Sequence, residues 1–272
     1  MSIPTPAELD AIVAQRIEAS VTAGEHRSGG GLAGMARLLG KWRQAHMDRA
    51  IFAQTGGVVM TGPFAGLQFV ARSTEGCHAP KLIGCYESEL HPIIETIAAT
   101  PYQTVLNIGC AEGYYAVGLA RRMPNTRAIA RDTDERAQAS VRAVAARNGV
   151  SDRVETGGLF TPADFAAHAG TRTLVVCDIE GAEEELLNIG AAPALAGFDM
   201  LVEAHDCFRP GVSDRLAARF AATHHIERIR PKPEARSLPP AFDGLGDLER
   251  LMLVWEWRTG PTPWLWMTAR RD

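Results

Sequence analysis

Val105-Leu106-Asn107-Ile108-Gly109-Cys110-Ala111-Glu112-Gly113 is the most informative stretch of the chain, because an apolar strand runs directly into a turn of small residues. A helix is expected to begin at this turn and to extend over residues 113–123. Small residues at 109, 111 and 113 let the backbone approach a ligand closely and adopt conformations closed to larger side chains. The free amides at the start of the helix offer hydrogen bonds. The stretch therefore predicts a cofactor cradle.

The spacing within the turn bears on which cofactor binds. A dinucleotide site places glycines at the first, third and sixth positions and the pyrophosphate at the helix N-terminus. Here the sixth position is Tyr114, and Glu112 is expected to place a carboxylate inside the turn. A carboxylate there repels a pyrophosphate but tolerates a sulfonium and an ammonium group. The turn therefore favours S-adenosylmethionine, with an NAD-binding oxidoreductase as an alternative.

The same nine residues resemble the first motif of the class I methyltransferases, which reads apolar-apolar-acid-apolar-Gly-x-Gly-x-Gly. Two positions depart from the motif: Asn107 replaces the acid and Ala111 replaces the middle glycine. The resemblance implies that the motif binds S-adenosylmethionine. The residues expected to contact it here are Asn107, Gly109, Cys110, Ala111, Gly113 and Tyr114.

Composition and charge narrow the class of protein. The chain has 272 residues, enough for one large α/β domain with an accessory segment. Its net charge of −4 lacks the basic excess of a dedicated nucleic-acid binder, so no nucleic-acid partner is expected. The five scattered cysteines form no C-x-x-C pair and are expected to be reduced. With no signal-peptide pattern and no apolar run of membrane length, we expect a cytoplasmic protein without a membrane partner.

Alternating strand and helix patterns follow from Thr104 onward and define a predicted methyltransferase domain over residues 81–272. They predict an α/β fold with a doubly wound, mostly parallel sheet of the Rossmann-like methyltransferase kind. Residues 226–229 and 249–258 are expected to close it as an antiparallel strand pair. The other expected strands are 104–108, 127–131, 153–156, 173–178 and 199–205, and the helices are 88–99, 113–123, 134–147, 162–168, 182–189 and 213–222.

Residues 1–80 are expected to form an N-terminal helical accessory segment. Helices are predicted over 7–19 and 35–54, separated by a glycine-rich flexible linker, and two short strands over 58–60 and 67–70. The second helix carries Leu38, Leu39, Trp42 and Phe52, more apolar side chains than a solvated helix should have. The segment is therefore predicted to cover the substrate opening or to form a homodimer contact.

Two further segments are expected to hold the nucleoside. Asp132 lies at the end of the second predicted strand, where an acid accepts both ribose hydroxyls, whereas Asp134 is expected to cap the next helix. Gly158 and Leu159 follow the third strand, where the resemblance implies a loop that contacts adenine. The alternative for this glycine-containing segment is a simple loop.

A second motif follows the fourth predicted strand. The run Asp178-Ile179-Glu180-Gly181-Ala182-Glu183 resembles the Asp-x-Glu-Gly-x-Glu run of FkbM-type methyltransferases, which often methylate hydroxyls, and the upstream pair Tyr86-Glu87 fits the Tyr-Glu pair of that branch. The resemblance implies that Tyr86, Glu87, Asp178 and Glu180 belong to the cofactor site, with Asp178 at the methionine end. Glu183, Glu184 and Glu185 are interpreted as ordinary first-turn acids of a helix, without a chemical role.

The fifth predicted strand ends in three polar residues, Glu203, His205 and Asp206, which we interpret as the catalytic group. Histidine is the one side chain whose unperturbed pKa falls near neutrality, so His205 is expected to act as a general base oriented by a carboxylate. A divalent ion held by Asp178, Glu203 or Asp206, and His205 is an alternative, as is a purely structural role, and the expected site contains no metal.

The sequence thus predicts a methyltransferase that moves a methyl group from S-adenosylmethionine to an oxygen of a small-molecule or peptidic acceptor. Most of the acceleration is expected from holding nucleophile and methyl carbon close and collinear. An S-adenosylmethionine-binding scaffold or regulatory protein without transfer activity is the alternative from a different functional class.

Overall fold

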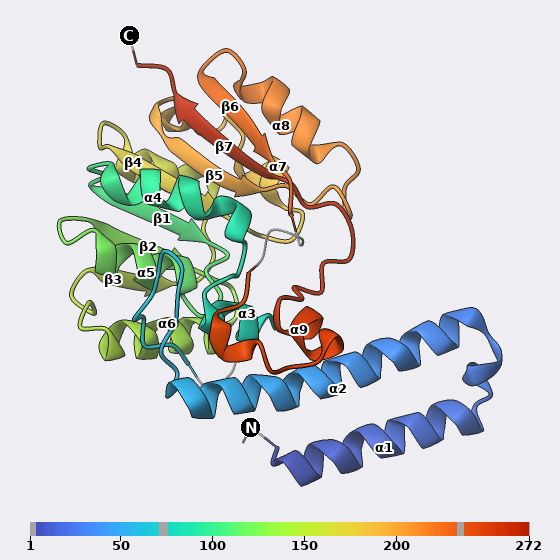
Figure 1. Ribbon diagram of the computed structural model, residues 1–272. Coiled ribbons are helices and arrows are strands. Elements are labelled where there is room, and N and C mark those ends of the chain that lie inside the picture. Colours follow the sequence, from blue (N-terminus) through green and yellow to red (C-terminus); the bar gives the residue numbers. More distant parts are fainter. Residues whose placement is uncertain (1–3, 71–75, 233–236, 272) are drawn as a thin grey trace.

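A seven-stranded sheet organises the computed structural model, which describes residues 4–70, 76–232 and 237–271 (Figure 1). The strand order is β3-β2-β1-β4-β5-β7-β6, parallel throughout except that β7 runs antiparallel to both β5 and β6. The predicted α/β fold with a doubly wound sheet and a C-terminal antiparallel pair is confirmed. The strands are β1 Thr104–Ile108, β2 Arg127–Arg131, β3 Val154–Gly157, β4 Thr173–Cys177, β5 Asp199–Glu203, β6 His224–Ile229 and β7 Trp264–Ala269.

Both faces of the sheet are covered, which explains why its central strands are almost continuously apolar. Alternate residues of a strand point to opposite faces. Val105 of β1 enters one hydrophobic core, whereas Leu106 and Ile108 enter the other. The first core is shared with α4 His91–Ala99, α5 Tyr114–Arg122 and α6 Glu135–Arg147, and the second with η3 Pro162–His168, α7 Glu183–Leu186, η4 Pro193–Gly197 and α8 Val212–Phe220.

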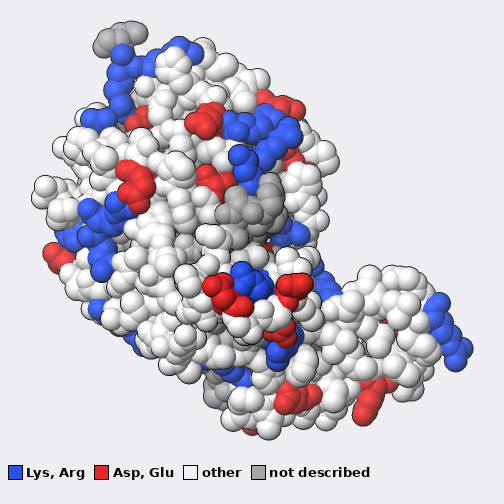
Figure 2. All heavy atoms as spheres, in the orientation of Figure 1, with Lys and Arg blue, Asp and Glu red and all other residues white. Residues whose placement is uncertain are grey.

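The N-terminal helices form a hairpin that projects from the body of the protein (Figures 1 and 2). Its arms are α1 Pro6–Thr22 and α2 Gly29–Thr55, with η1 Glu25–Arg27 between them. Asp10 joins the arms, because its Oδ1 accepts hydrogen bonds from Trp42 and His46 at 2.7 Å each. At the other end of α2, Met47 and Ile51 are buried in the core that also contains α5. The hairpin is therefore anchored to the body by its second helix.

The predicted flexible linker is wrong, because α2 begins within the glycine-rich stretch. Ser28 caps the helix by accepting the Gly31 amide at 3.0 Å, and a capping side chain offsets much of the cost of starting a helix. Gly31 is also required for packing, since a Cβ there would overlap the backbone carbonyl of Glu25. Gly31 therefore permits the close approach between η1 and the start of α2.

The predicted strands at 58–60 and 67–70 reduce to a single antiparallel bridge between Val58 and Gln68. The amides of Met60 and Thr61 donate instead to the carbonyls of Leu82 and Ile83, at 2.8 and 3.1 Å. Those carbonyls belong to α3 His78–Ile83, which precedes η2 Ser88–Leu90. Backbone groups predicted to form a hairpin are therefore used to hold α3.

Residues 249–258 were predicted as the last strand of the sheet, and this prediction is wrong. Asp247–Leu253 forms helix α9 after η6 Pro240–Phe242, and β6 pairs with β7 instead. Helical spacing places Leu253 in the core, whereas Leu248 and Leu251 are 62% and 58% exposed. The segments predicted as helices 162–168 and 182–189 are a 3-10 helix and the four-residue α7. Within the described residues, no helix is long and apolar enough to cross a membrane.

Candidate active site

A cavity of about 750 Å³ lies at the carboxyl ends of β1, β2 and β4. This is the edge at which open α/β sheets bind their ligands. The described residues that line it lie between Ile108 and Leu186, so the lining includes none of the described N-terminal segment. Of the predicted cofactor-binding residues it includes Gly109, Ala111, Asp132, Gly158, Leu159, Asp178 and Glu180.

The turn after β1 is held in an unusual backbone conformation. Gly109 has φ 73°, and a Cβ at this position would overlap the backbone carbonyl oxygen of Asp178, so the position requires glycine. Ala111 has φ 44°, a left-handed conformation that is unfavourable for alanine. Its amide donates to Asp132 Oδ2 at 2.9 Å. The bond ties the turn to the end of β2 and stabilises the strained residue.

Asp132 occupies the position predicted for a ribose acceptor. Besides the Ala111 amide on Oδ2, its Oδ1 accepts the amide of Asp134 at 2.9 Å. Each carboxylate oxygen has a second lone pair, so both still have capacity to accept a hydroxyl. Asp134 accepts the Arg136 amide at 2.9 Å at the start of α6, which confirms its predicted role as the helix cap.

Several of the residues predicted to bind the cofactor are not among the described residues that line this cavity. Asn107 is buried and donates from Nδ2 to the Val176 carbonyl at 3.4 Å. Tyr114 packs edge-on against Phe64 and Tyr86, with ring centroids 5.1 and 5.7 Å apart. The predicted residues outside the lining are Tyr86, Glu87, Asn107, Cys110, Gly113 and Tyr114.

Glu112 does not direct its carboxylate into the ligand space of the turn, contrary to the prediction. The side chain is fully buried, and its Oε2 lies 3.2 Å from Nζ of Lys81, which is also buried. Lys81 comes from α3, so this ion pair connects α3 to the turn. Repulsion by Glu112 is therefore no longer an argument against a pyrophosphate.

The charged residues that line the cavity, unlike Glu112, bear directly on whether a pyrophosphate would bind there. Among the described lining residues, five carboxylates face one guanidinium group, that of Arg131. Arg131 is itself paired with Glu155 at 2.5 Å. Two of the acids are paired as well, Asp134 with Arg136 and Glu185 with Arg209, which leaves three acids outside these ion pairs. The lining therefore favours a cationic ligand over a pyrophosphate. The five acids are Asp132, Asp134, Asp178, Glu180 and Glu185.

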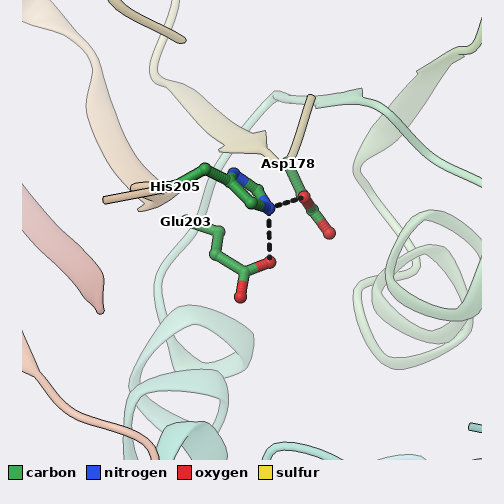
Figure 3. A group of neighbouring side chains, drawn as sticks. All are labelled: Asp178, Glu203 and His205. Carbon is green, nitrogen blue, oxygen red and sulfur yellow. Dashed lines mark ion pairs between the residues drawn. The ribbon is translucent and has the colours of Figure 1, made fainter. Parts of the chain in front are cut away.

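Asp178, Glu203 and His205 meet beside this cavity (Figure 3). Glu203 ends β5, His205 follows two residues later, and Asp178 follows β4, so adjacent strands deliver all three. His205 Nε2 lies 3.6 Å from Asp178 Oδ1 and 3.8 Å from Glu203 Oε2. It also lies 3.4 Å from Oε2 of the exposed Glu180. The predicted convergence of strand-four and strand-five residues is thus present.

The hydrogen-bonding partner of His205 is Glu183, to which sequence reasoning assigned no role. Glu183 Oε1 lies 2.8 Å from His205 Nδ1 and accepts the Gly181 amide at 3.0 Å. Glu183 is fully buried, unlike an ordinary first-turn acid. The available sequence signal was its place as the last acid of the Asp-x-Glu-Gly-x-Glu run.

The pKa values of this pair shift in the directions expected for an ion pair. Burial lowers the pKa of His205, but the Glu183 hydrogen bond and the neighbouring carboxylates, Glu203 foremost, leave it raised overall. Burial raises the pKa of Glu183, but the hydrogen bonds from His205 and Gly181 leave it lowered overall. His205 therefore retains a proton to higher pH than an ordinary histidine, so less of it is in the neutral form that can accept a proton at neutral pH.

Asp206, predicted to belong to the catalytic group, instead binds the start of α8. Its two carboxylate oxygens accept the amide and the hydroxyl of Ser213, at 3.0 and 2.6 Å. Asp206 is therefore not the carboxylate that orients His205.

Glu203 also pairs with Arg258, a residue that sequence reasoning did not select. The Arg258 guanidinium contacts Glu87 at 2.8 Å and Glu256 at 3.0 Å. Burial raises the pKa of Glu87 to about 8 despite the attraction of Arg258. Glu87 also accepts a hydrogen bond from the Tyr115 hydroxyl. Arg258 thus links Glu87 to Glu203, and Glu87 lies outside the residues that line the cavity.

Trp257, next to Arg258, contacts the N-terminal hairpin. It has φ 56°, which is unusual for a bulky residue. Its ring lies 5.2 Å from the guanidinium of Arg37, and its Nε1 donates to Gln44, both of which belong to α2. Gly40 of α2 is required there, because a Cβ would lie 2.8 Å from the Trp257 ring. Two neighbouring residues of one loop therefore link two parts of the protein: Trp257 contacts the hairpin, and Arg258 contacts Glu203 of the Asp178–Glu203–His205 group.

No protein-family model and no curated protein match the chain. Among solved structures, it is similar to the O-methyltransferase TomG from Streptomyces achromogenes, in complex with S-adenosylmethionine, with 14% identity, a TM-score of 0.45 and coverage of 84% of this chain and 90% of that chain. An O-methyltransferase from Bacillus cereus in complex with S-adenosylhomocysteine has 13% identity, a TM-score of 0.44 and coverages of 65% and 78%. A precorrin-6Y C5,15-methyltransferase domain from Corynebacterium diphtheriae has 15% identity, a TM-score of 0.43 and coverages of 66% and 95%. Likenesses at this level do not establish a shared activity.

Proposed function

We propose that the protein is an S-adenosylmethionine-dependent methyltransferase. The acidic cavity at the carboxyl ends of β1, β2 and β4 is the observation that carries this proposal. Its volume of about 750 Å³ lies within the range of small-molecule and cofactor sites. Five lining carboxylates against one guanidinium suit a sulfonium and an ammonium group better than a pyrophosphate. In this proposal Asp132, which lines the cavity, accepts the ribose hydroxyls, and Gly158 and Leu159 contact the adenine.

We assign the acceptor side of the site to Asp178, Glu203 and His205, with oxygen as the methylated atom and an FkbM-like branch as the finer family assignment. Asp178 lines the cofactor cavity and also contacts His205, so it links the two halves of the site. The chemistry is in-line displacement at the methyl carbon, with positioning of the reacting atoms as the main source of acceleration. The acceptor is a small-molecule or peptidic hydroxyl.

Ligand-dependent melting tests the cofactor assignment. S-adenosylhomocysteine should raise the melting temperature, because a ligand that binds only the folded state stabilises it, whereas NAD should not. Asp132→Ala should weaken S-adenosylhomocysteine binding by roughly 1.5–3 kcal/mol, the scale of a hydrogen bond to a charged group. The matched control is Glu135→Ala, which removes an exposed carboxylate from the start of α6. Equal stabilisation by NAD, or an unchanged affinity in Asp132→Ala, would contradict the assignment.

Methyl transfer itself is tested with S-adenosylmethionine carrying an isotope-labelled methyl group. The protein is incubated with this cofactor and a metabolite extract, and labelled products are identified by mass spectrometry. A product labelled on oxygen supports the proposal. Cofactor binding without any labelled product would favour the alternative, a scaffold or regulatory protein without transfer activity.

A further inference from the structure

We propose that Asp178, Glu203 and His205 bind a divalent transition-metal ion such as Mn²⁺ or Zn²⁺. One ligand atom from each of these residues lies within 4.8 Å of the others, and the side chains of Glu203 and His205 are 6% and 4% exposed (Figure 3). This proposal departs from the sequence-based expectation of a metal-free site. It concerns ion binding and does not depend on the identity of the methyl acceptor.

The spacing of the ligand atoms is the first observation that points to an ion. The distances of 3.6 and 3.8 Å from His205 Nε2 to Asp178 and Glu203 are longer than ordinary N–H···O bonds. Ligands about 2.1 Å from a tetrahedrally coordinated metal are separated from one another by about 3.4 Å. Small side-chain adjustments would therefore bring the three atoms around a common ion.

The contact behind His205 is a second, independent observation. Glu183 binds Nδ1 at 2.8 Å, which orients the ring so that Nε2 points towards Asp178 and Glu203. Histidines that bind metals commonly donate their other ring N–H to such a carboxylate, which fixes the tautomer and increases the basicity of the ligand. Because Glu183 is fully buried, the orientation is maintained by the packed interior.

The environment of Glu203 leaves one of its oxygens facing the cluster. Oε1 is held by Arg258, whereas Oε2 faces His205. One imidazole and two carboxylates suit manganese, iron or zinc better than magnesium, which prefers oxygen ligands throughout. Glu180 Oε2, 3.4 Å from Nε2, is available to complete the protein ligands, because its side chain is 73% exposed and therefore adjustable. The remaining coordination positions would be open to water or an acceptor oxygen.

Direct ion binding provides a test that does not require turnover. Protein stripped with a chelator and dialysed is titrated with Mn²⁺, and the free ion is measured by electron paramagnetic resonance. The wild type should bind one ion with a dissociation constant below about 1 mM. Asp178→Asn and Glu203→Gln should each weaken binding at least tenfold, and Glu183→Gln, which acts through His205, by about 10–100-fold.

Glu184→Gln is the matched control, because Glu184 is on the same short helix but pairs with Arg215 at 2.8 Å. Its Mn²⁺ affinity should equal that of the wild type. Circular dichroism verifies that each variant is folded, and S-adenosylhomocysteine binding is measured separately in the metal-free protein, so the cofactor proposal and the metal proposal fail independently. Wild-type binding weaker than about 1 mM, or equal affinity in the folded ligand variants, overturns the site.

Discussion

Acidification should destabilise the protein through His78, a residue of α3 remote from the active-site cluster. The ring of His78 is 3% exposed and stacks between Phe52 and Phe69, with centroids 6.1 and 6.0 Å away. Neither ring nitrogen has a hydrogen-bond partner among the described residues. Burial, followed by the charge of Lys81, lowers the pKa of His78 from 6.5 to about 4 despite the opposing effect of Glu112. The folded protein therefore keeps this imidazole neutral.

The size of the effect follows from proton linkage. Between pH 6.5 and pH 4 the unfolded chain binds a proton at His78 that the folded chain excludes, so the free energy of unfolding falls as the pH falls. Integrating between pH 7 and pH 5 gives a loss of roughly 2 kcal/mol, and the complete shift corresponds to roughly 3.4 kcal/mol below pH 4.

Asp48 acts in the opposite direction in the same region. Burial raises its pKa from 3.8 to about 7, although the amide of Ala79 donates to it. The folded chain thus retains a proton that the unfolded chain releases, and the resulting stabilisation is lost as the pH rises through 7. The pH profile of the wild type alone therefore does not report His78.

The assay compares wild type with His78→Phe by urea unfolding at pH 7, 6 and 5. Phenylalanine retains stacking with Phe52 and Phe69 but cannot bind a proton. Any steric effect of the substitution therefore changes the free energy of unfolding by the same amount at every pH. The difference between the two free energies of unfolding removes the contribution of Asp48. It should move by roughly 2 kcal/mol in favour of the variant between pH 7 and pH 5. Parallel profiles for the two proteins would refute the reasoning.

Three further predictions follow from described contacts. Gly109→Ala should abolish S-adenosylhomocysteine binding in calorimetry. The control is Gly149→Ala: Gly149 has φ 66°, but an added Cβ would meet no atom within 4 Å, so the variant should lose only about 1–3 kcal/mol of free energy of unfolding through backbone strain. Equal effects of the two substitutions on binding would contradict the overlap at residue 109. Tyr102→Phe should lower the free energy of unfolding by roughly 1.5–3 kcal/mol, because its hydroxyl donates to Asp199 at 2.6 Å, and an unchanged urea midpoint would count against that bond. Removing residues 1–28 should convert a homodimer to a monomer in sedimentation without changing cofactor affinity, because it removes α1, which carries the exposed Ile12, from the segment predicted to form a homodimer contact. A monomeric full-length chain would show that the hairpin is not such a contact.

The fold was predictable where local pattern and burial agree. The predicted strands at 104–108 and 127–131 coincide with β1 and β2, because their apolar runs are buried on both faces. The end of the chain was not predictable in this way. The sequence predicts a strand over 249–258, but strand pairing depends on partners distant in sequence, and β6 pairs with β7 instead. Helix α9 occupies the intervening residues.

Prediction of the site succeeded for position and failed for side-chain direction. Sheet topology alone brings Asp132 and Asp178 to one edge, so their proximity could be expected from the order of strands. Glu183 faces His205 because α7 is only four residues long and its acid is buried, which helix-start statistics do not reveal. Glu112 faces the interior because Lys81, 31 residues earlier, supplies the opposite charge there.

The loop that carries Trp257 and Arg258 has a consequence for how this protein could be recombined with others. Trp257 fits against Gly40 and Gln44 of the hairpin, whereas Arg258 holds Glu203. A chimera that exchanged the hairpin alone would confront Trp257 with a foreign helix surface and disturb the adjacent arginine. The hairpin and the loop near the opposite end of the chain therefore form one structural unit, and both must be transferred together in a chimera.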